Sequence, residues 1–197
     1  MSPHYMPLVI LVGAAFTENI LLVNYLGMCS FLGVSREMKA AAGLGAAVTL
    51  VLSVSCTLNY MVNTYILVPF DMLHLQFIAF MLVIAATVQF MEMAIERFSP
   101  RLYYALGIFL PLITVNCAIL GGCLFMSIRQ YNLAQSAAYG AGAGLGWWLA
   151  IVAMAGIRQR LQAARLPKGL DGPGITLIIA GIMALAFTGL AGMLNIR

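Results

Sequence analysis

Six long runs of apolar residues cover most of the chain, and short polar segments separate them. A helix that crosses a membrane needs about 20 mostly apolar residues, and each run is near or above that length. The pattern predicts an all-α membrane protein with about six transmembrane helices in one integral membrane domain, residues 1–197. The predicted spans cover residues 7–34, 40–62, 72–94, 102–126, 133–157 and 174–195.

The composition supports a membrane protein and excludes a water-soluble fold. Hydrophobic residues make up 63% of the chain and charged residues 8%, with a mean hydropathy of +1.00. Soluble domains typically carry about 25% charged residues. The net charge of +4 does not indicate a nucleic-acid partner, because the basic residues lie at the ends of apolar runs without interleaved aromatic residues. The N-terminus lacks the basic stretch and cleavage site of a secretory signal, so we expect the first run to remain as a span.

The basic residues are distributed unequally between the two ends of the predicted helices. The first, third and fifth connectors hold eight of the ten, whereas the second and fourth connectors and the C-terminus hold two. By the positive-inside rule, this difference predicts that both termini lie outside the cytoplasm. The eight are Arg36, Lys39, Arg97, Arg101, Arg158, Arg160, Arg165 and Lys168, and the two are Arg129 and Arg197.

Two short motifs recur in the same order and indicate an internal duplication. Cys followed by a small residue, an apolar residue, Leu and Gly occupies residues 29–33 and 117–121, and Ala-Gly-Leu-Gly occupies residues 42–45 and 143–146. The repeats would cover about residues 1–97 and 98–197. Because three spans per repeat is an odd number, the second repeat enters the membrane upside down, as in other inverted repeats.

Interrupted helices at matching places in inverted repeats mark functional sites. We expect breaks in spans one and four, each presenting one cysteine toward the pseudo-twofold axis. Span one is too long for one straight helix, and a proline inside span four would kink it. The residues that indicate these breaks are Asn19, Asn24 and Gly27 in the first span and Gly107, Pro111, Gly121 and Gly122 in the second.

The two symmetric cysteines, Cys29 and Cys117, are candidate ligands because packing alone does not require a thiol at both positions. A disulfide at the bilayer centre would lie away from oxidising machinery. Thiolates also bind iron–sulfur clusters, copper(I) or zinc, and a two-iron cluster needs four of them. The chain would then hold half a site. Cys56 and Cys123 lack symmetric counterparts and are interpreted as packed apolar thiols.

Polar residues inside the spans suggest a candidate cation path. Glu18 and Asn19 lie in span one and Asn116 in span four, and intramembrane carboxylates commonly serve ions or protons. No connector is large enough to bind NADH, and no Gly-x-Gly-x-x-Gly unit follows a predicted strand. If the chain takes part in redox chemistry, other subunits must deliver and remove the electrons.

The chain resembles a known family of paired membrane subunits. Tyr-Leu-Gly-Met-Cys at residues 25–29, the segment 106–122 that ends Asn-Cys-Ala-Ile-Leu-Gly-Gly, and Gly-Trp-Trp-Leu-Ala-Ile-Val-Ala at 146–153 are similar to subunits of the sodium-translocating NADH:quinone reductase (Nqr) and the related Rnf complex. The segments 17–20, 114–117 and 169–176 are most similar to the E-type subunit of Nqr (NqrE). The short second connector instead resembles the A-type subunit of Rnf (RnfA), and the balance favours Nqr.

The resemblance implies a role in membrane electron transport. The protein would pair with an oppositely inserted homologue, NqrD or RnfE, within a six-subunit complex of the bacterial inner membrane. Cys29 and Cys117 match the family's cluster cysteines, and the partner would contribute the other two thiolates of a shared 2Fe-2S cluster. The cluster would relay electrons across the membrane, coupled to Na⁺ or H⁺ pumping, while other subunits bind NAD, flavins and quinone.

Three alternatives compete with the Nqr hypothesis. The first is membership of an Rnf complex, which would serve ferredoxin:NAD electron transport coupled to ion translocation. The second is a secondary cation transporter, because inverted repeats and broken helices are common in that class. The third is a purely structural role in assembly. Iron analysis distinguishes a cluster-holding protein from a transporter, which has no reason to carry iron.

Overall fold

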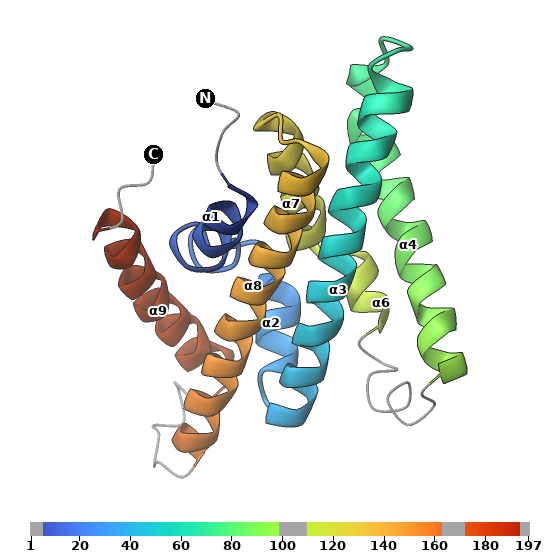
Figure 1. The fold of residues 1–197 in the computed structure, drawn as a ribbon. Helices are drawn as coiled ribbons and strands as arrows, with labels where there is room; N and C mark the ends of the chain where they lie inside the picture. Colours follow the sequence, from blue (N-terminus) through green and yellow to red (C-terminus); the bar gives the residue numbers. More distant parts are fainter. Residues whose placement is uncertain (1–5, 99–109, 163–171, 194–197) are drawn as a thin grey trace.

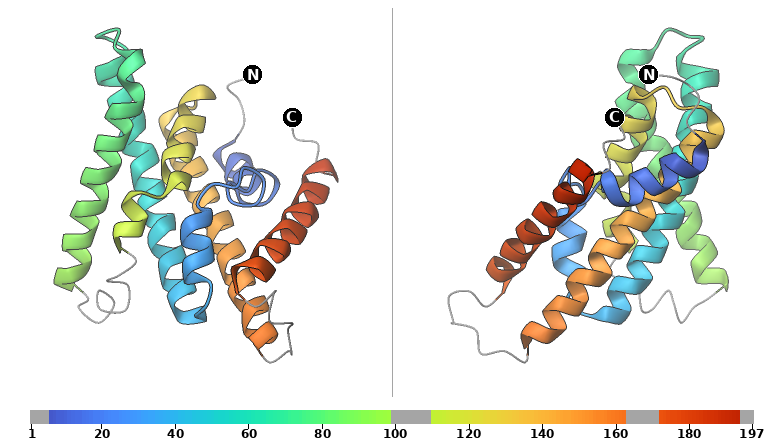
Figure 2. Two further views of the ribbon diagram at one scale, coloured as in Figure 1. Left: turned by 180° about the vertical axis from the view of Figure 1, so that it is seen from behind. Right: turned by 60° about the vertical axis from the view of Figure 1, so that its left-hand side comes forward.

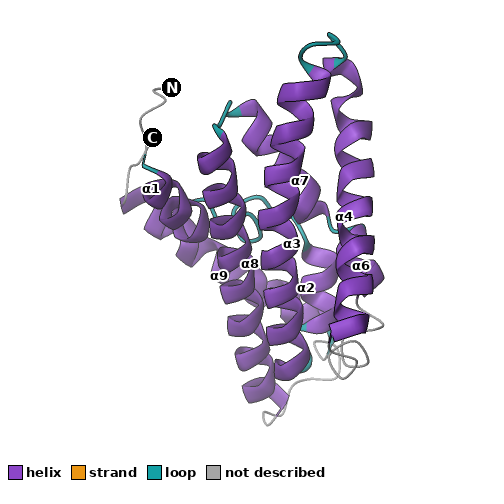
Figure 3. Cartoon of the chain, turned by 45° about the vertical axis from the view of Figure 1, so that its right-hand side comes forward, coloured by secondary structure: helices purple, strands orange, loops and turns teal. Residues whose placement is uncertain are grey.

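The computed structural model describes residues 6–98, 110–162 and 172–193, and every regular element in them is helical (Figure 3). The all-α prediction is therefore confirmed for the described part of the chain. In chain order the elements are α1 (Pro7–Val12), the π-helix η1 (Gly13–Thr17), α2 (Met28–Val34), α3 (Met38–Val62), the π-helix η2 (Asn63–Leu67), the 3₁₀-helix η3 (Leu73–Leu75), α4 (Gln76–Phe98), α6 (Leu110–Thr114), α7 (Cys117–Ile128), α8 (Leu133–Gln162) and α9 (Pro173–Met193).

The apolar segments fall where the hydropathy pattern predicts them. Among the described residues, three helical segments are long and apolar enough to cross a membrane, and three shorter apolar segments accompany them. The protein is accordingly a membrane protein built of apolar helices. The long segments are Met38–Leu67, Leu73–Ala94 and Leu133–Leu161, and the shorter ones are Pro7–Thr17, Leu112–Ile128 and Pro173–Gly189.

Both predicted helix breaks are present. In the first, η1 ends at Thr17 and the chain returns to an α-helix only at Met28. In the second, α6 ends at Thr114 and α7 begins at Cys117, so the break is only two residues long. Each break thus lies immediately before the helix that carries a candidate cysteine.

The second break does not lie where the proline predicts it. Pro111 lies in α6, and the described helix continues past it to Thr114 without a break. The interruption occurs instead at Val115 and Asn116. Gly121 and Gly122, also expected to break the span, lie inside α7. Gly107 lies outside the described residues.

The centre of the structure is an antiparallel pair, α3 and α8 (Figure 1). Glycines on α8 allow the two helices to approach closely. A Cβ added to Gly144 would lie 2.6 Å from the Cα of Thr49, and one added to Gly140 would lie 2.9 Å from the carbonyl oxygen of Leu52. Small residues that allow this approach are typical of membrane helix packing.

A second pair of glycines on α8 contacts the first broken helix. A Cβ on Gly142 would lie 2.3 Å from the carbonyl oxygen of Leu11, and one on Gly146 would lie 2.5 Å from that of Ala15. Figure 1 views α1 nearly end-on and α8 from the side, so α1 crosses α8 at a steep angle. The glycines of α8 therefore form two contact surfaces, one for α3 and one for α1 with η1.

The remaining long helices, α4 and α9, lie on opposite flanks of this centre (Figure 2). Helix α4 contacts α3, α6 and α7, whereas α9 contacts α8 and η1. Each flanking helix thus packs on the broken helix of the other half of the chain. Their outer faces are apolar and exposed, as at Leu82 and Leu185, which is expected of surfaces that meet lipid or another membrane protein.

Candidate cofactor site at the two helix breaks

Asn19 organises the first break, residues 18–27. Its side-chain oxygen accepts hydrogen bonds from the backbone N–H groups of Leu21 (3.0 Å) and Leu22 (3.3 Å). Its amide nitrogen donates to the carbonyl oxygen of Gly146 on α8 at 2.8 Å. Asn19 is completely buried, so it supplies partners that a non-helical backbone inside a membrane cannot obtain from lipid.

Gly27 ends the first break and starts α2. Its φ of +85° is left-handed, a conformation that favours glycine. A Cβ at this position would lie 2.6 Å from the indole nitrogen of Trp147 and 3.0 Å from the side-chain oxygen of Asn116. The Gly27 N–H donates to the sulfur of Cys117 at 2.9 Å. This hydrogen bond joins the two breaks directly.

Asn116 caps the helix that follows the second break. Its side-chain oxygen accepts a hydrogen bond from the N–H of Ala118 at 3.1 Å, the usual role of asparagine at a helix N-terminus. Its amide nitrogen donates to the hydroxyl of Ser30 at 3.4 Å, and that hydroxyl donates to the carbonyl oxygen of Gly27 at 3.1 Å. The cap of α7 is therefore bonded to the first turn of α2.

Both candidate cysteines occupy the first turn of a helix that follows a break. Cys29 is the second residue of α2 and Cys117 the first of α7, and both are exposed free thiols. Because the Gly27 N–H contacts the Cys117 sulfur, Cys117 lies against the segment that carries Cys29 two residues later. The two breaks thus bring together cysteines 88 residues apart in the sequence.

This arrangement can support thiolate ligands. Backbone N–H groups stabilise negative charge on sulfur, both at a helix N-terminus and by direct hydrogen bonding around iron–sulfur clusters. Two thiolates do not complete a four-ligand site. The described residues contain no group of three or more His, Cys, Asp or Glu side chains that could hold a metal ion. Cys29 and Cys117, both exposed, therefore fit two of the four ligands of a cluster.

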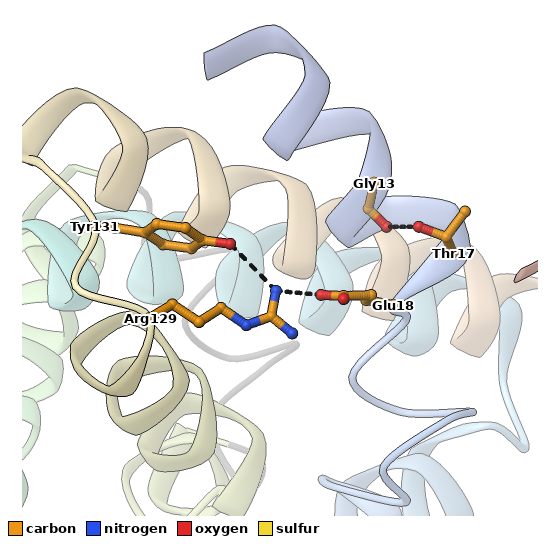
Figure 4. Close-up of polar contacts among 5 residues, drawn as sticks. All are labelled: Gly13, Thr17, Glu18, Arg129 and Tyr131. Atoms are coloured by element: carbon orange, nitrogen blue, oxygen red, sulfur yellow. Dashed lines mark hydrogen bonds and ion pairs between the residues drawn. The ribbon is translucent and has the colours of Figure 1, made fainter. Parts of the chain in front are cut away.

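Glu18 forms an ion pair with Arg129, the first residue after α7 (Figure 4). Arg129 also donates to the hydroxyl of Tyr131 at 3.2 Å and lies over the ring of Tyr139. Burial opposes the charged guanidinium, but the hydrogen bonds to Glu18 and Tyr131 raise the pKa of Arg129 above its ordinary value. The pair connects the end of η1 to the end of α7. It therefore holds the two broken helices together at the end of α7 opposite to Cys117.

Cys56 and Cys123 lie elsewhere, in the α3–α7 interface. Both are completely buried, and their sulfurs are 3.8 Å apart. They are distinct from the exposed pair, Cys29 and Cys117. Ser30 is only the small residue of the repeated cysteine motif in the sequence, and the structure adds its hydrogen bonds to Gly27 and Asn116. The pairing of Glu18 with Arg129 is likewise visible only in the structure.

Long apolar helices with buried breaks define the class: this is a multi-pass membrane protein. A family model described as "Rnf-Nqr subunit, membrane protein" matches residues 8–194. The chain belongs to this family of Rnf-Nqr membrane proteins.

Several similar proteins are named as the E-type subunit of the Na⁺-translocating NADH-quinone reductase. The protein from Serratia proteamaculans (strain 568) is 54% identical over 196 residues, a match that covers 96% of this chain and 98% of the relative. Those from Yersinia pestis (strain Pestoides F) and Aeromonas salmonicida (strain A449) are 52% and 50% identical with the same coverage. The resemblance to NqrE is thereby confirmed.

We expect Gly27→Ala to destabilise the protein by about 1–3 kcal/mol, because the new methyl group collides with Trp147 and alanine disfavours a left-handed φ. Gly33→Ala is the matched control, since Gly33 lies on the same helix with no atom within 4 Å of the added carbon. Thermal unfolding of the purified complex measures both variants. Equal midpoints for the two variants would contradict the close packing at Gly27.

Proposed function

We propose that this chain acts as the E-type membrane component of a Na⁺-translocating NADH-quinone reductase and holds half of an intramembrane 2Fe-2S cluster through Cys29 and Cys117. The observation that carries the proposal is the hydrogen bond from the Gly27 N–H to the Cys117 sulfur. It joins two helix breaks, each followed within two residues by an exposed free thiol. The names of the relatives support the same complex.

The number of available thiolates favours a cluster shared between two chains over a site within one chain. A 2Fe-2S cluster supplies one-electron transfer when bound, and it takes four thiolates. Cys29 and Cys117 provide two, and both are exposed on the isolated chain. A homologous, oppositely inserted protein, NqrD, would contribute the other two and cover the exposed thiols. NADH, flavins and quinone bind to other subunits of the same complex.

The chain's own residues prepare this site. Gly27 donates its N–H to the Cys117 sulfur and thereby stabilises the thiolate. Asn116 and Ser30 fix the two helix starts relative to each other. Asn19 accepts hydrogen bonds from two backbone N–H groups of the first break, so these buried groups need no water partner.

The packing supports six spans arranged as two inverted repeats. The two copies of Ala-Gly-Leu-Gly lie on α3 and α8, which run antiparallel. Helix α4 packs against α6 and α7, and α9 packs against η1. This correspondence is what two oppositely oriented copies of one three-helix unit would produce.

A candidate cation path through Glu18, Asn19 and Asn116 remains part of the proposal. All three side chains have partners within the chain: Glu18 pairs with Arg129, and both asparagines cap backbone groups. Glu18 is 43% exposed at its side chain, so a cation can reach its carboxylate by displacing Arg129.

We also propose that both termini face the outside of the bacterial inner membrane. The end of α8 lies beside the first connector, because Arg158 donates to Ser35 at 2.7 Å. Figure 1 shows the end of α4 at the same end of the bundle. The described helix ends next to the basic connectors therefore lie on one side, which supports the orientation that the positive-inside rule predicts. Reporter fusions at the C-terminus and within Arg158–Lys168 should behave oppositely, and an external signal from the connector would refute this topology.

We expect Cys29→Ala and Cys117→Ala each to abolish cluster binding and NADH-to-quinone electron transfer. Each substitution removes one of four sulfur ligands, and neither lipid nor a methyl group replaces a thiolate. Iron content and the electron paramagnetic resonance signal of the purified complex measure the loss.

Cys56→Ala and Cys123→Ala are the matched controls, because these buried thiols lie on α3 and α7 away from the breaks. Each should leave the iron content intact. Cys56→Ala should cost about 1 kcal/mol of stability or somewhat more through a small cavity, and Cys123→Ala should cost about 1–3 kcal/mol more, because it removes the hydrogen-bond acceptor of the Asn59 amide. Full iron occupancy with normal turnover in the Cys29 variant would instead favour a transporter or a structural protein.

A further inference from the structure

A stripe of polar side chains lies in the α3–α7 interface, apart from the cysteine breaks. Ser55, Asn59 and Asn63 follow one another at intervals of four residues, so they share one face of the helix. Ser55 and Asn59 are completely buried. Such residues are rare inside a membrane span unless they have a function.

The nitrogen atoms of the two asparagines have partners on α7. Asn59 donates to the sulfur of Cys123 at 3.1 Å, and Asn63 donates to the hydroxyl of Ser127 at 3.5 Å. Gln76, at the start of α4, donates to the same hydroxyl. These contacts hold both amides in the interface, about one helical turn (5.4 Å) apart along the axis.

The side-chain oxygens of this stripe differ from the nitrogens. The side-chain oxygens of Ser55, Asn59 and Asn63 are all buried and lack a hydrogen-bond partner among the residues that the structure describes. Leaving a carbonyl oxygen unpaired in a low-dielectric interior is costly. One N–H of each asparagine amide bonds to α7, whereas neither amide oxygen accepts a hydrogen bond among the described residues. The lone pairs of these oxygens are therefore available to a cation.

We propose that the side-chain oxygens of Asn59 and Asn63, one helical turn apart, form a binding site for a monovalent cation, with bound water completing its coordination shell. Amide and hydroxyl oxygens are hard ligands that suit alkali and alkaline-earth cations. Divalent sites usually include carboxylates, and neither asparagine carries charge. The naming of the cation as Na⁺ rests on the proposed function, whereas the site itself rests on the unpaired oxygens.

The helix geometry is unusual at this place. The π-helix η2 begins at Asn63 and continues α3 with wider turns. Such π-helical turns often occur at functional sites. The ends of α3 and α7 and the start of α4 lie at the same end of the bundle (Figure 1), so the stripe leads from the interior toward that membrane surface.

The proposed site and the second break share helix α7. Cys123, which accepts the hydrogen bond from Asn59, is six residues after Cys117 on the same helix, a rise of about 9 Å. At this separation in a protein interior, positive charge in the site favours negative charge at the break. Cation occupancy and charge at Cys117 are therefore coupled electrostatically.

The site differs from the candidate path through Glu18, Asn19 and Asn116. The oxygens of those three side chains already bond to Arg129 or to backbone N–H groups. A cation would have to displace these partners. At Asn59 and Asn63 a cation would displace no hydrogen-bond donor of the described part of the chain, because the two oxygens accept none there.

Variants of the intact purified complex test the proposal in a Na⁺ titration of quinone reduction and of thermal unfolding. Asn59→Ala and Asn63→Ala each remove one ligand, so we expect the half-maximal Na⁺ concentration to rise about tenfold in both assays. Asn59→Asp keeps the oxygens and adds charge. It should lower the half-maximal Na⁺ concentration and make it pH dependent, because a proton replaces the cation on the buried carboxyl group.

Thr57→Ala and Ser53→Ala are the matched controls on the same helix, because both hydroxyls bond to a backbone carbonyl one turn earlier. They should titrate as the wild type does. If Asn59→Asp and Asn63→Ala also titrate as the wild type, the oxygens hold only water and the proposal is overturned. Iron content, measured in the same samples, separates this result from failure of the cluster assignment.

Discussion

The hydrogen bond from the Gly27 amide to the Cys117 sulfur joins two helix breaks that lie 90 residues apart in the sequence. A membrane interior tolerates non-helical backbone only where protein or water satisfies the freed polar groups. Here the two breaks and α8 satisfy one another: Asn116 reaches Ser30 in α2, and Asn19 reaches Gly146 in α8. The cysteines owe their proximity to this mutual support, so the proposed cofactor site exists only if the breaks meet.

Residues without a Cβ make the meeting sterically feasible. Gly146 allows η1 to lie against α8, which brings Asn19 within hydrogen-bonding distance of the Gly146 carbonyl oxygen. Gly27 fits between Trp147 and Asn116. On the other side of the pair, Gly45 of α3 packs against the ring of Trp148. The glycines of the recurring Ala-Gly-Leu-Gly motif thus allow close helix packing at the centre of the molecule, where the two halves of the chain are in contact.

The helical class and the existence of two breaks are predictable because they depend on local patterns of hydrophobicity and helix-disfavouring residues. The exact residue of the second break is not predictable from local sequence, because Asn116 caps α7 and also bonds to Ser30, 86 residues earlier. The Glu18–Arg129 pair likewise depends on contacts between distant elements. The four-residue spacing of Ser55, Asn59 and Asn63 is a local signal, but only the structure reveals that their oxygens are unpaired.

The central claim is that two broken helices of one chain present two thiolates to one cofactor. Anomalous X-ray scattering at the iron edge, measured on crystals of the intact complex, tests it most directly. We expect two neighbouring anomalous peaks, one for each iron atom, beside the place where Gly27 contacts Cys117. The sulfurs of both Cys29 and Cys117 should lie within bonding distance of this iron pair. Iron located away from these sulfurs, or two cysteines separated by intervening protein, would contradict the claim.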